Sequence, residues 1–230
     1  MKLTTLMVGA ALSFAAAQAA NASVYVLNFA GLNGNAEEPV ENYYNGGFGG
    51  DGSGPGPNYG ITFTSNALSC SGQPGGTCNT AEIPGGPGAN TLFFLGGGAA
   101  TMNVAAGFTT GFSFYYSAVN NPGFINVWSG VNDTGTLLAT LNLPTTPNDG
   151  DPGCYGTNFC PYVAINVAFA GTAESVDFGG TLNQVGFADV TLGSNTAGGA
   201  PEPASWALML IGVAGLGAAI RGKRRQIATA

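Results

Sequence analysis

Short segments of alternating apolar and polar residues recur along the middle of the chain. In segments 112–116 and 137–143, large apolar side chains recur at every second position. This period of two is typical of a β-strand with one buried face, because successive side chains of a strand point to opposite sides. No stretch between residues 23 and 195 shows a sustained helical period. The pattern therefore predicts an all-β body.

Gly, Pro and Asn separate the predicted strands. The strands are expected at residues 24–29, 61–64, 91–95, 101–105, 111–118, 124–128, 137–143, 162–169, 175–178 and 184–192. Many short strands in a chain of this size favour an antiparallel β-sandwich, of which the jelly roll is one form. Segment 131–136, VNDTGT, is the clearest hairpin turn, because Asn, Asp and Gly tolerate the backbone angles of a tight connection.

Two long segments, 31–60 and 71–88, are dominated by Gly, Pro and Asn. They are expected to be long loops or partly disordered segments. The Gly-rich run 46–57 does not have the features of a phosphate-binding loop, because it lacks both a G-K-[ST] ending and any Lys.

The first residues have the three regions of a secretory signal peptide. Lys2 precedes an apolar run over residues 3–17, and small residues follow, ending in Ala20-Asn21-Ala22. We predict that signal peptidase cleaves before Ser23, so that residues 1–22 are removed and the body spans 23–195. Cleavage after Ala19 is the alternative site, and a buried helix is the alternative interpretation of the apolar run.

The last part of the chain, residues 196–230, is a linker followed by an ordered series of features. A leader at 196–200, expected to be flexible, precedes the tripeptide PEP at 201–203, an uncharged apolar stretch at 204–220 and a basic cluster at 221–225. As a helix the apolar stretch would reach roughly 25 Å, enough to cross a thin bilayer. The basic cluster would stay in the cytoplasm and leave the body on the far side of the membrane.

This series resembles the PEP-CTERM sorting signal in its PEP-x-x-W-A form. The matching positions are Pro201, Glu202, Pro203, Trp206 and Ala207, followed by the basic residues Arg221, Lys223, Arg224 and Arg225. The resemblance implies recognition by an exosortase, a membrane processing enzyme of Gram-negative bacteria that make exopolysaccharide. It implies transient anchoring in the inner membrane and delivery to the outer envelope or the extracellular matrix. An ordinary anchor that stays uncut is the alternative for the apolar stretch.

Charge excludes several classes of function. Charged residues make up only 7% of the chain, and no Lys, Arg or His lies between Leu3 and Ile220. Nucleic-acid binding is excluded, because Lys and Arg supply most of its affinity. Catalysis by Ser-His-Asp or Cys-His groups lacks its base. A carboxylate pair of the glycosidase type, formed by Glu174 with Asp177 or Asp189, is the arrangement that remains. We nevertheless predict that the chain is not an enzyme.

Four cysteines lie in two loop-like stretches, at Cys70 and Cys78 and at Cys154 and Cys160. Three connectivities exist, but pairing within each stretch closes the shortest loops. Metal binding is disfavoured because the spacing is not C-x-x-C and histidines are absent. Export favours disulfides.

Calcium is the one cofactor considered, with no other expected. The segment 148–151 concentrates hard oxygen ligands, with Asp149 and Asp151 as the candidate metal ligands, and Glu37 and Glu38 with Asp189 form a second candidate group. An Asx-rich turn without an ion is the alternative, because the EF-hand spacing is absent.

Loop aromatics suggest a second function. The rings of Tyr43, Tyr44, Tyr59, Tyr155 and Phe159 would either stack on sugar rings or pack over the sandwich. We therefore predict an exported structural protein of the cell surface, matrix or biofilm. The alternative is a lectin-like module that binds exopolysaccharide and contains structural Ca²⁺.

Overall fold

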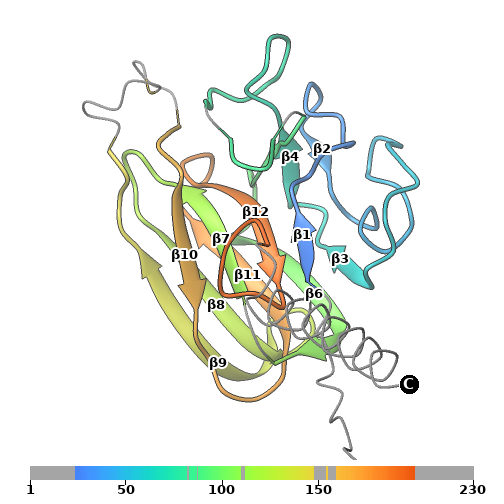
Figure 1. Ribbon diagram of the computed structural model, residues 1–230, viewed down its shortest axis with the longest axis vertical. Coiled ribbons are helices and arrows are strands. Elements are labelled where there is room, and N and C mark those ends of the chain that lie inside the picture. The colour runs from blue at the N-terminus through green and yellow to red at the C-terminus, as the bar shows by residue number, and fades with distance from the viewer. Residues whose placement is uncertain are drawn as a thin grey trace, which may run out of the picture.

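The computed structural model describes residues 24–81, 83–86, 88–109, 112–147, 154 and 159–199 (Figure 1). The predicted signal peptide, the sorting signal with its apolar stretch, and the candidate residues Asp149, Asp151 and Tyr155 lie outside the described residues. In the described part of the chain, no helix is long and apolar enough to span a bilayer.

The described residues form two antiparallel β-sheets that pack face to face as a sandwich. The seven-stranded sheet has the order β10 (Val163–Val167), β7 (Phe112–Ser117), β12 (Gly186–Leu192), β5 (Thr91–Phe93), β4 (Leu68–Cys70), β2 (Glu38–Pro39), with β1 (Tyr25–Leu27) also paired to β12. The five-stranded sheet has the order β3 (Ile61–Phe63), β6 (Ala99–Phe108), β11 (Ala173–Gly180), β8 (Gly123–Gly130), β9 (Thr134–Leu143).

A cluster of aromatic rings fills the core between the sheets. Phe114 and Phe187 come from the seven-stranded sheet and Phe178 from the five-stranded one, and all three side chains are fully buried. Their rings meet edge to face, with Phe178 centred 5.1 Å from Phe187 and 5.9 Å from Phe114. Such contacts add to the gain from burying apolar area. The period of two seen in 112–116 is thus the buried face of β7.

The prediction of an all-β sandwich is confirmed, and each of the ten predicted strands overlaps an observed one. The predicted turn at 131–136 joins β8 to β9, with Asn132 and Asp133 at φ values of 53° and 61°. Two strands were missed, β2 and β4, which have two and three residues and lie within or beside Gly-, Pro- and Asn-rich segments that predicted loops. Their position in the sheet comes from long-range pairing.

The Gly-rich segment 31–60 is packed against the β2–β4 end of the sandwich, at the other end of the sheet from β10 (Figure 1). The buried carboxylate of Glu38 organises it by accepting backbone N–H groups of three residues, Asn33 at 2.6 Å, Ser53 at 2.9 Å and Asp51 at 3.1 Å. Burial favours a higher pKa for Glu38, but the Ser53 side chain and, after it, the three backbone N–H groups stabilise the carboxylate and lower the pKa.

The leader at 196–199 also packs against the body, contrary to its expected flexibility. Ala197 is buried, and the backbone N–H of Gly198 donates to Thr191 Oγ1 at 3.0 Å. A Cβ atom on Gly199 would lie 2.7 Å from Val26 Cγ2, which is too close for any larger residue without a shift. The leader therefore closes over β1 and β12, because its small residues allow this close approach.

The Glu38 contacts generate a stability prediction. Glu38→Gln replaces one acceptor oxygen by an NH₂ group that faces backbone donors, so we expect a loss of roughly 2–4 kcal/mol in the free energy of unfolding. Urea denaturation of the exported protein measures it. Glu41→Gln, at a partly exposed acid nearby, serves as the control and should change stability little. Equal stability of the two variants would contradict the organising role of Glu38.

Candidate functional site on the outer face of the five-stranded sheet

The outer face of the five-stranded sheet is formed by residues that alternate with the core positions of β6, β11, β8 and β9. Paired residues on adjacent antiparallel strands lie on the same face, so they form rows across the sheet. The rows are Asn103, Ser175, Trp128 and Leu137; Thr101, Asp177, Asn126 and Thr140; and Ala99, Gly179, Phe124 and Asn142. We call this set the outer face.

Trp128 lies half-buried in the first of these rows. Its indole Nε1–H donates to Asp177 Oδ2 at 3.1 Å, and Asp177 itself is almost fully buried on β11. Leu137, the cross-strand partner of Trp128 on β9, is 46% exposed. The hydrogen bond orients the indole on the sheet, and the neighbouring leucine extends an apolar strip beside it.

Phe124 places a second aromatic ring on the same face, four residues before Trp128 on β8. The ring crosses the neighbouring strand at Gly179, where a Cβ atom would overlap the atoms of the ring. Only glycine at position 179 leaves space for the Phe124 ring to lie across β11. The outer face therefore carries two half-buried aromatic rings between polar side chains.

The β8–β9 turn folds back over this face and brings a second carboxyl group to Asp177. Thr101 Oγ1 lies 3.1 Å from Asp133 Oδ2 and 3.1 Å from Asp177 Oδ1. The backbone N–H of Asp133 donates to Ser175 Oγ at 3.1 Å, and the Ser175 hydroxyl donates to Gly130 O at 2.6 Å. Side chains of β6 and β11 thus hold the tip of the turn.

The two carboxyl groups share a site without any cation. Burial raises the pKa of Asp133 to about 7, and the hydrogen bond to Asp177 and the negative charge of Asp177 act in the same direction. The Thr101 hydroxyl acts in the opposite direction. Near neutral pH the pair therefore holds a proton, as close carboxyl pairs do. Asp177 pairs with Asp133 here, a partner that sequence reasoning did not select.

The loop tyrosines mostly belong to the core. Tyr43 and Tyr44 are buried, and the Tyr44 hydroxyl accepts the Phe29 backbone N–H at 2.7 Å. Tyr59 is half-buried and stacks on Tyr25, with ring centroids 4.7 Å apart. Of the two alternatives for Tyr43 and Tyr44, packing over the sandwich is the one observed, because their rings fill the space between segment 31–60 and the sandwich. The alternation within β8 was the signal that could have directed attention to Trp128.

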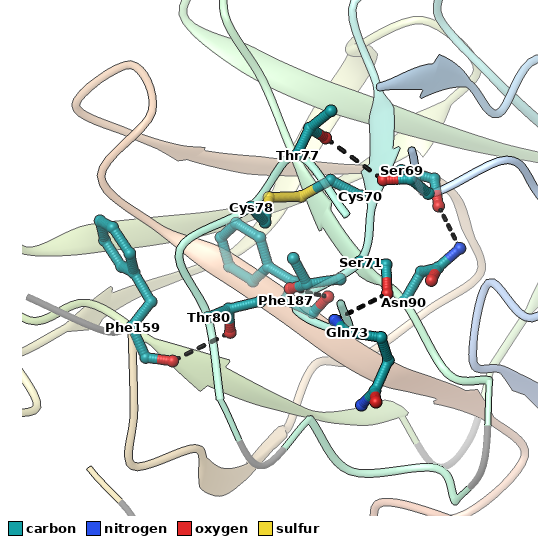
Figure 2. Close-up of a disulfide and its surroundings, with 12 residues drawn as sticks. Ser69, Cys70, Ser71, Gln73, Thr77, Cys78, Thr80, Asn90, Phe159 and Phe187 are labelled. Atoms are coloured by element: carbon teal, nitrogen blue, oxygen red, sulfur yellow. Dashed lines mark hydrogen bonds between the residues drawn. A yellow bond between two sulfur atoms is a disulfide. The ribbon is translucent and has the colours of Figure 1, made fainter. Parts of the chain in front are cut away.

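Both disulfides join cysteines within one stretch, Cys70 with Cys78 and Cys154 with Cys160, each with a Cα–Cα distance of 5.6 Å. Figure 2 shows the first of them, which ties β4 to the loop that leads to Thr80. Pairing within each stretch is the connectivity favoured by the short loops.

A recess of about 160 Å³ lies beside the first disulfide. Its hydroxyl groups bind one another: Tyr162 OH lies 2.9 Å from Thr80 Oγ1 and donates to Thr91 Oγ1 at 2.9 Å. Thr80 in turn donates to Phe159 O at 2.9 Å (Figure 2). Thr91 donates to Phe187 O at 3.1 Å. Because these hydroxyls are engaged in a chain of mutual contacts, we select the outer face and not this recess as the candidate site.

The predicted acidic metal groups do not assemble in the described residues. Among them, no group of three or more His, Cys, Asp or Glu side chains is placed to hold a metal ion. Glu37, Glu38 and Asp189 therefore do not form a common cluster, and the Glu38 carboxylate is occupied by backbone donors.

The acid pair generates a prediction about pH. The pKa of Asp133 is about 7 in the folded state against an ordinary 3.8, so between these values the folded protein holds a proton that the unfolded chain releases. The stability from this proton is complete below pH 3.8 and is lost as the pH rises through 7. We expect Asp133→Asn to reduce this fall, as measured by urea denaturation between pH 4 and 8.

Asn tolerates the positive φ at position 133, so the turn should persist in this variant. Burial also raises the pKa of Asp189, so a smaller slope should remain in Asp133→Asn. Asp51→Asn, at an exposed acid, should keep the slope of the wild-type protein. If Asp133→Asn also keeps the full slope, the acid pair does not control stability.

Comparison with known proteins locates one similarity. Residues 200–225 match the PEP-CTERM protein-sorting motif, over the same residues that carry the resemblance in the sequence. Neither a curated protein nor a solved structure matches the chain. The motif marks a protein that is exported and sorted at the membrane by an exosortase. The chain therefore carries a PEP-CTERM sorting signal behind a β-sandwich body.

Proposed function

We propose that the chain is a non-enzymatic structural protein of the outer envelope or extracellular matrix of a Gram-negative bacterium. Signal peptidase removes residues 1–22, the exosortase acts at the PEP motif, and the β-sandwich body is displayed in an exopolysaccharide matrix or biofilm. The observation that carries this proposal is the match of residues 200–225 to the sorting motif.

The chemistry of the body supports a structural role. It has no His, Lys or Arg between residues 3 and 220, so the usual bases and cationic anion clamps of enzymes are missing. The acid pair of Asp133 and Asp177 is engaged with Thr101 and Trp128 and fastens the β8–β9 turn. Two disulfides close short loops and suit an oxidising exterior.

Processing at the PEP motif can be tested by intact mass. We expect the protein recovered outside producing cells to lack the segment 206–225, and Pro203→Ala to prevent this processing. Pro147→Ala, at an exposed proline of the body, is the control and should be processed normally. A membrane-bound product that keeps 206–225 in the unchanged chain would contradict sorting by cleavage and indicate a permanent anchor.

A second candidate function, polysaccharide binding, is favoured by the outer face. Apolar faces of sugar rings pack on aromatic rings, and sugar hydroxyls bond to amides and carboxylates. The outer face combines Trp128 and Phe124 with Asn126, whose side-chain oxygen accepts from Thr140 at 2.9 Å. The acidic body repels anionic polymers, so the expected ligand is a neutral polysaccharide.

Affinity electrophoresis in gels that contain dextran or soluble β-glucan tests this second function. We expect Trp128→Ala to weaken retention by about tenfold, because an aromatic stacking surface is lost. Trp128→Phe keeps a ring without the hydrogen bond to Asp177 and should retain part of the affinity. The control Phe48→Ala removes an aromatic ring that is 55% exposed outside the outer face, and it should bind normally. Absence of retention of the wild-type protein would leave the structural role alone.

A further inference from the structure

The two sides of the sandwich differ in how the terminal strands of its sheets are covered. On one side, segment 31–60 bonds to both terminal strands. The backbone N–H of Phe63 on β3 donates to Glu41 O at 2.9 Å. The N–H of Gly50 donates to Pro39 O of β2 at 2.8 Å. On the other side the sheets end in β9 and β10 (Figure 1). Within the described residues, no loop makes a backbone–backbone hydrogen bond to either of these two strands.

β9 is the longer of these two open edges and carries none of the residues that usually block pairing at an edge. It spans ten residues and contains no Lys, Pro, Asp or Glu. Its pairing with β8 is irregular between Thr134 and Ala139 but regular from Ala139 to Leu143. The free backbone groups of an edge strand pair readily with another strand unless charge, proline or irregularity prevents it. Residues 139–143 therefore form an edge that is open to a further strand.

The sequence of this edge is complementary to itself. In an antiparallel pair centred on Leu141, Ala139 would lie opposite Leu143 of a second copy, and Thr140 opposite Asn142. Ala139 and Leu141 pack on the core and are only half-buried, so a second strand would cover more of them. Thr140 and Asn142 are exposed on the outer face. Apolar side chains would thus meet apolar ones, and a hydroxyl would meet an amide, as in stable cross-strand pairs.

Charge also favours a second copy as the occupant of this edge. The body carries acids but no cationic side chain between residues 3 and 220, so two copies repel each other over most of their surfaces. The edge at 139–143 is neutral, so pairing there brings no carboxylate opposite another. A partner recognised by positive charge would be attracted to the acidic surface elsewhere and not to this neutral strand.

We propose that two copies of this chain pair antiparallel through residues 139–143 of β9. Their five-stranded sheets would join into one continuous sheet, with five strands from each copy. The pair is isologous, and its two-fold axis runs perpendicular to the sheet, so both outer faces lie on the same side. The inference rests on the structural role proposed above, because pairing of copies supplies cohesion between displayed bodies.

Sedimentation velocity of the protein recovered outside producing cells tests the pairing. A range from about 10 µM to 1 mM suits the small, transient interface of a short edge, and the unchanged chain should shift from monomer to dimer across it. Thr140→Glu with Asn142→Glu places carboxylates opposite each other, so the dimer Kd should rise by about tenfold. Thr140→Lys with Asn142→Glu places opposite charges there and should restore the dimer.

The charged variants change the same two positions, so a general loss of folding would affect both. Ser65→Glu with Gln73→Glu adds two carboxylates at exposed residues outside β9 and should pair as the unchanged chain does. An unchanged chain that stays monomeric, or equal association of the Glu/Glu and Lys/Glu variants, would overturn the proposal. Failure of the proposed function differs from both results, because it gives a membrane-bound product, and pairing is then measured on the detergent-solubilised chain.

Discussion

The absence of cations from the body is the constraint on which its polar interior depends. With no Lys, Arg or His between residues 3 and 220, no buried carboxylate can form an ion pair with a side chain of the body. Glu38 is satisfied by backbone N–H groups, and Asp177 by a hydroxyl and an indole. Asp133 shares a proton with Asp177, and the Oδ1 atoms of Asp133 and Asp189 are both buried without a hydrogen-bond partner. The stabilisation of each buried acid therefore depends on the hydrogen-bond donors that the fold places next to it.

These hydrogen bonds hold the long loops and turns against the hydrophobic core of the sandwich. The rings of Phe114, Phe178 and Phe187 join the two sheets, and burial of such rings contributes most of the stabilisation. The Glu38 carboxylate holds segment 31–60 through hydrogen bonds from its backbone N–H groups. The Thr101 hydroxyl holds the β8–β9 turn through its hydrogen bond to Asp133. A buried carboxylate can accept hydrogen bonds from several backbone N–H groups at once. These bonds hold a loop rich in Gly and Pro in one conformation.

The sorting signal and the folded body occupy separate parts of the chain. The motif at 200–225 marks the chain for export and sorting at the membrane, and it follows the last strand of the sandwich in the sequence. The sandwich contributes a surface, and the aromatic rings of Trp128 and Phe124 on the outer face are its most specific feature. The leader at 196–199, packed on the body, links the two parts without a free spacer between residues 193 and 199.

The sequence by itself determined ten of the twelve described strands, the turn at 131–136, the favoured disulfide pairing and the sorting motif, because each depends on neighbouring residues. Tertiary structure decided which rings are exposed. Tyr43 and Tyr44 were equal candidates with other loop aromatics, yet they are buried, since burial depends on what a loop packs against. It also brought Asp133 to Asp177, because pairing of β8 with β9 and β11 carries a distant turn over the central strand. A period of two reveals that a strand has two faces, but only the packing of the sheets decides which face meets solvent.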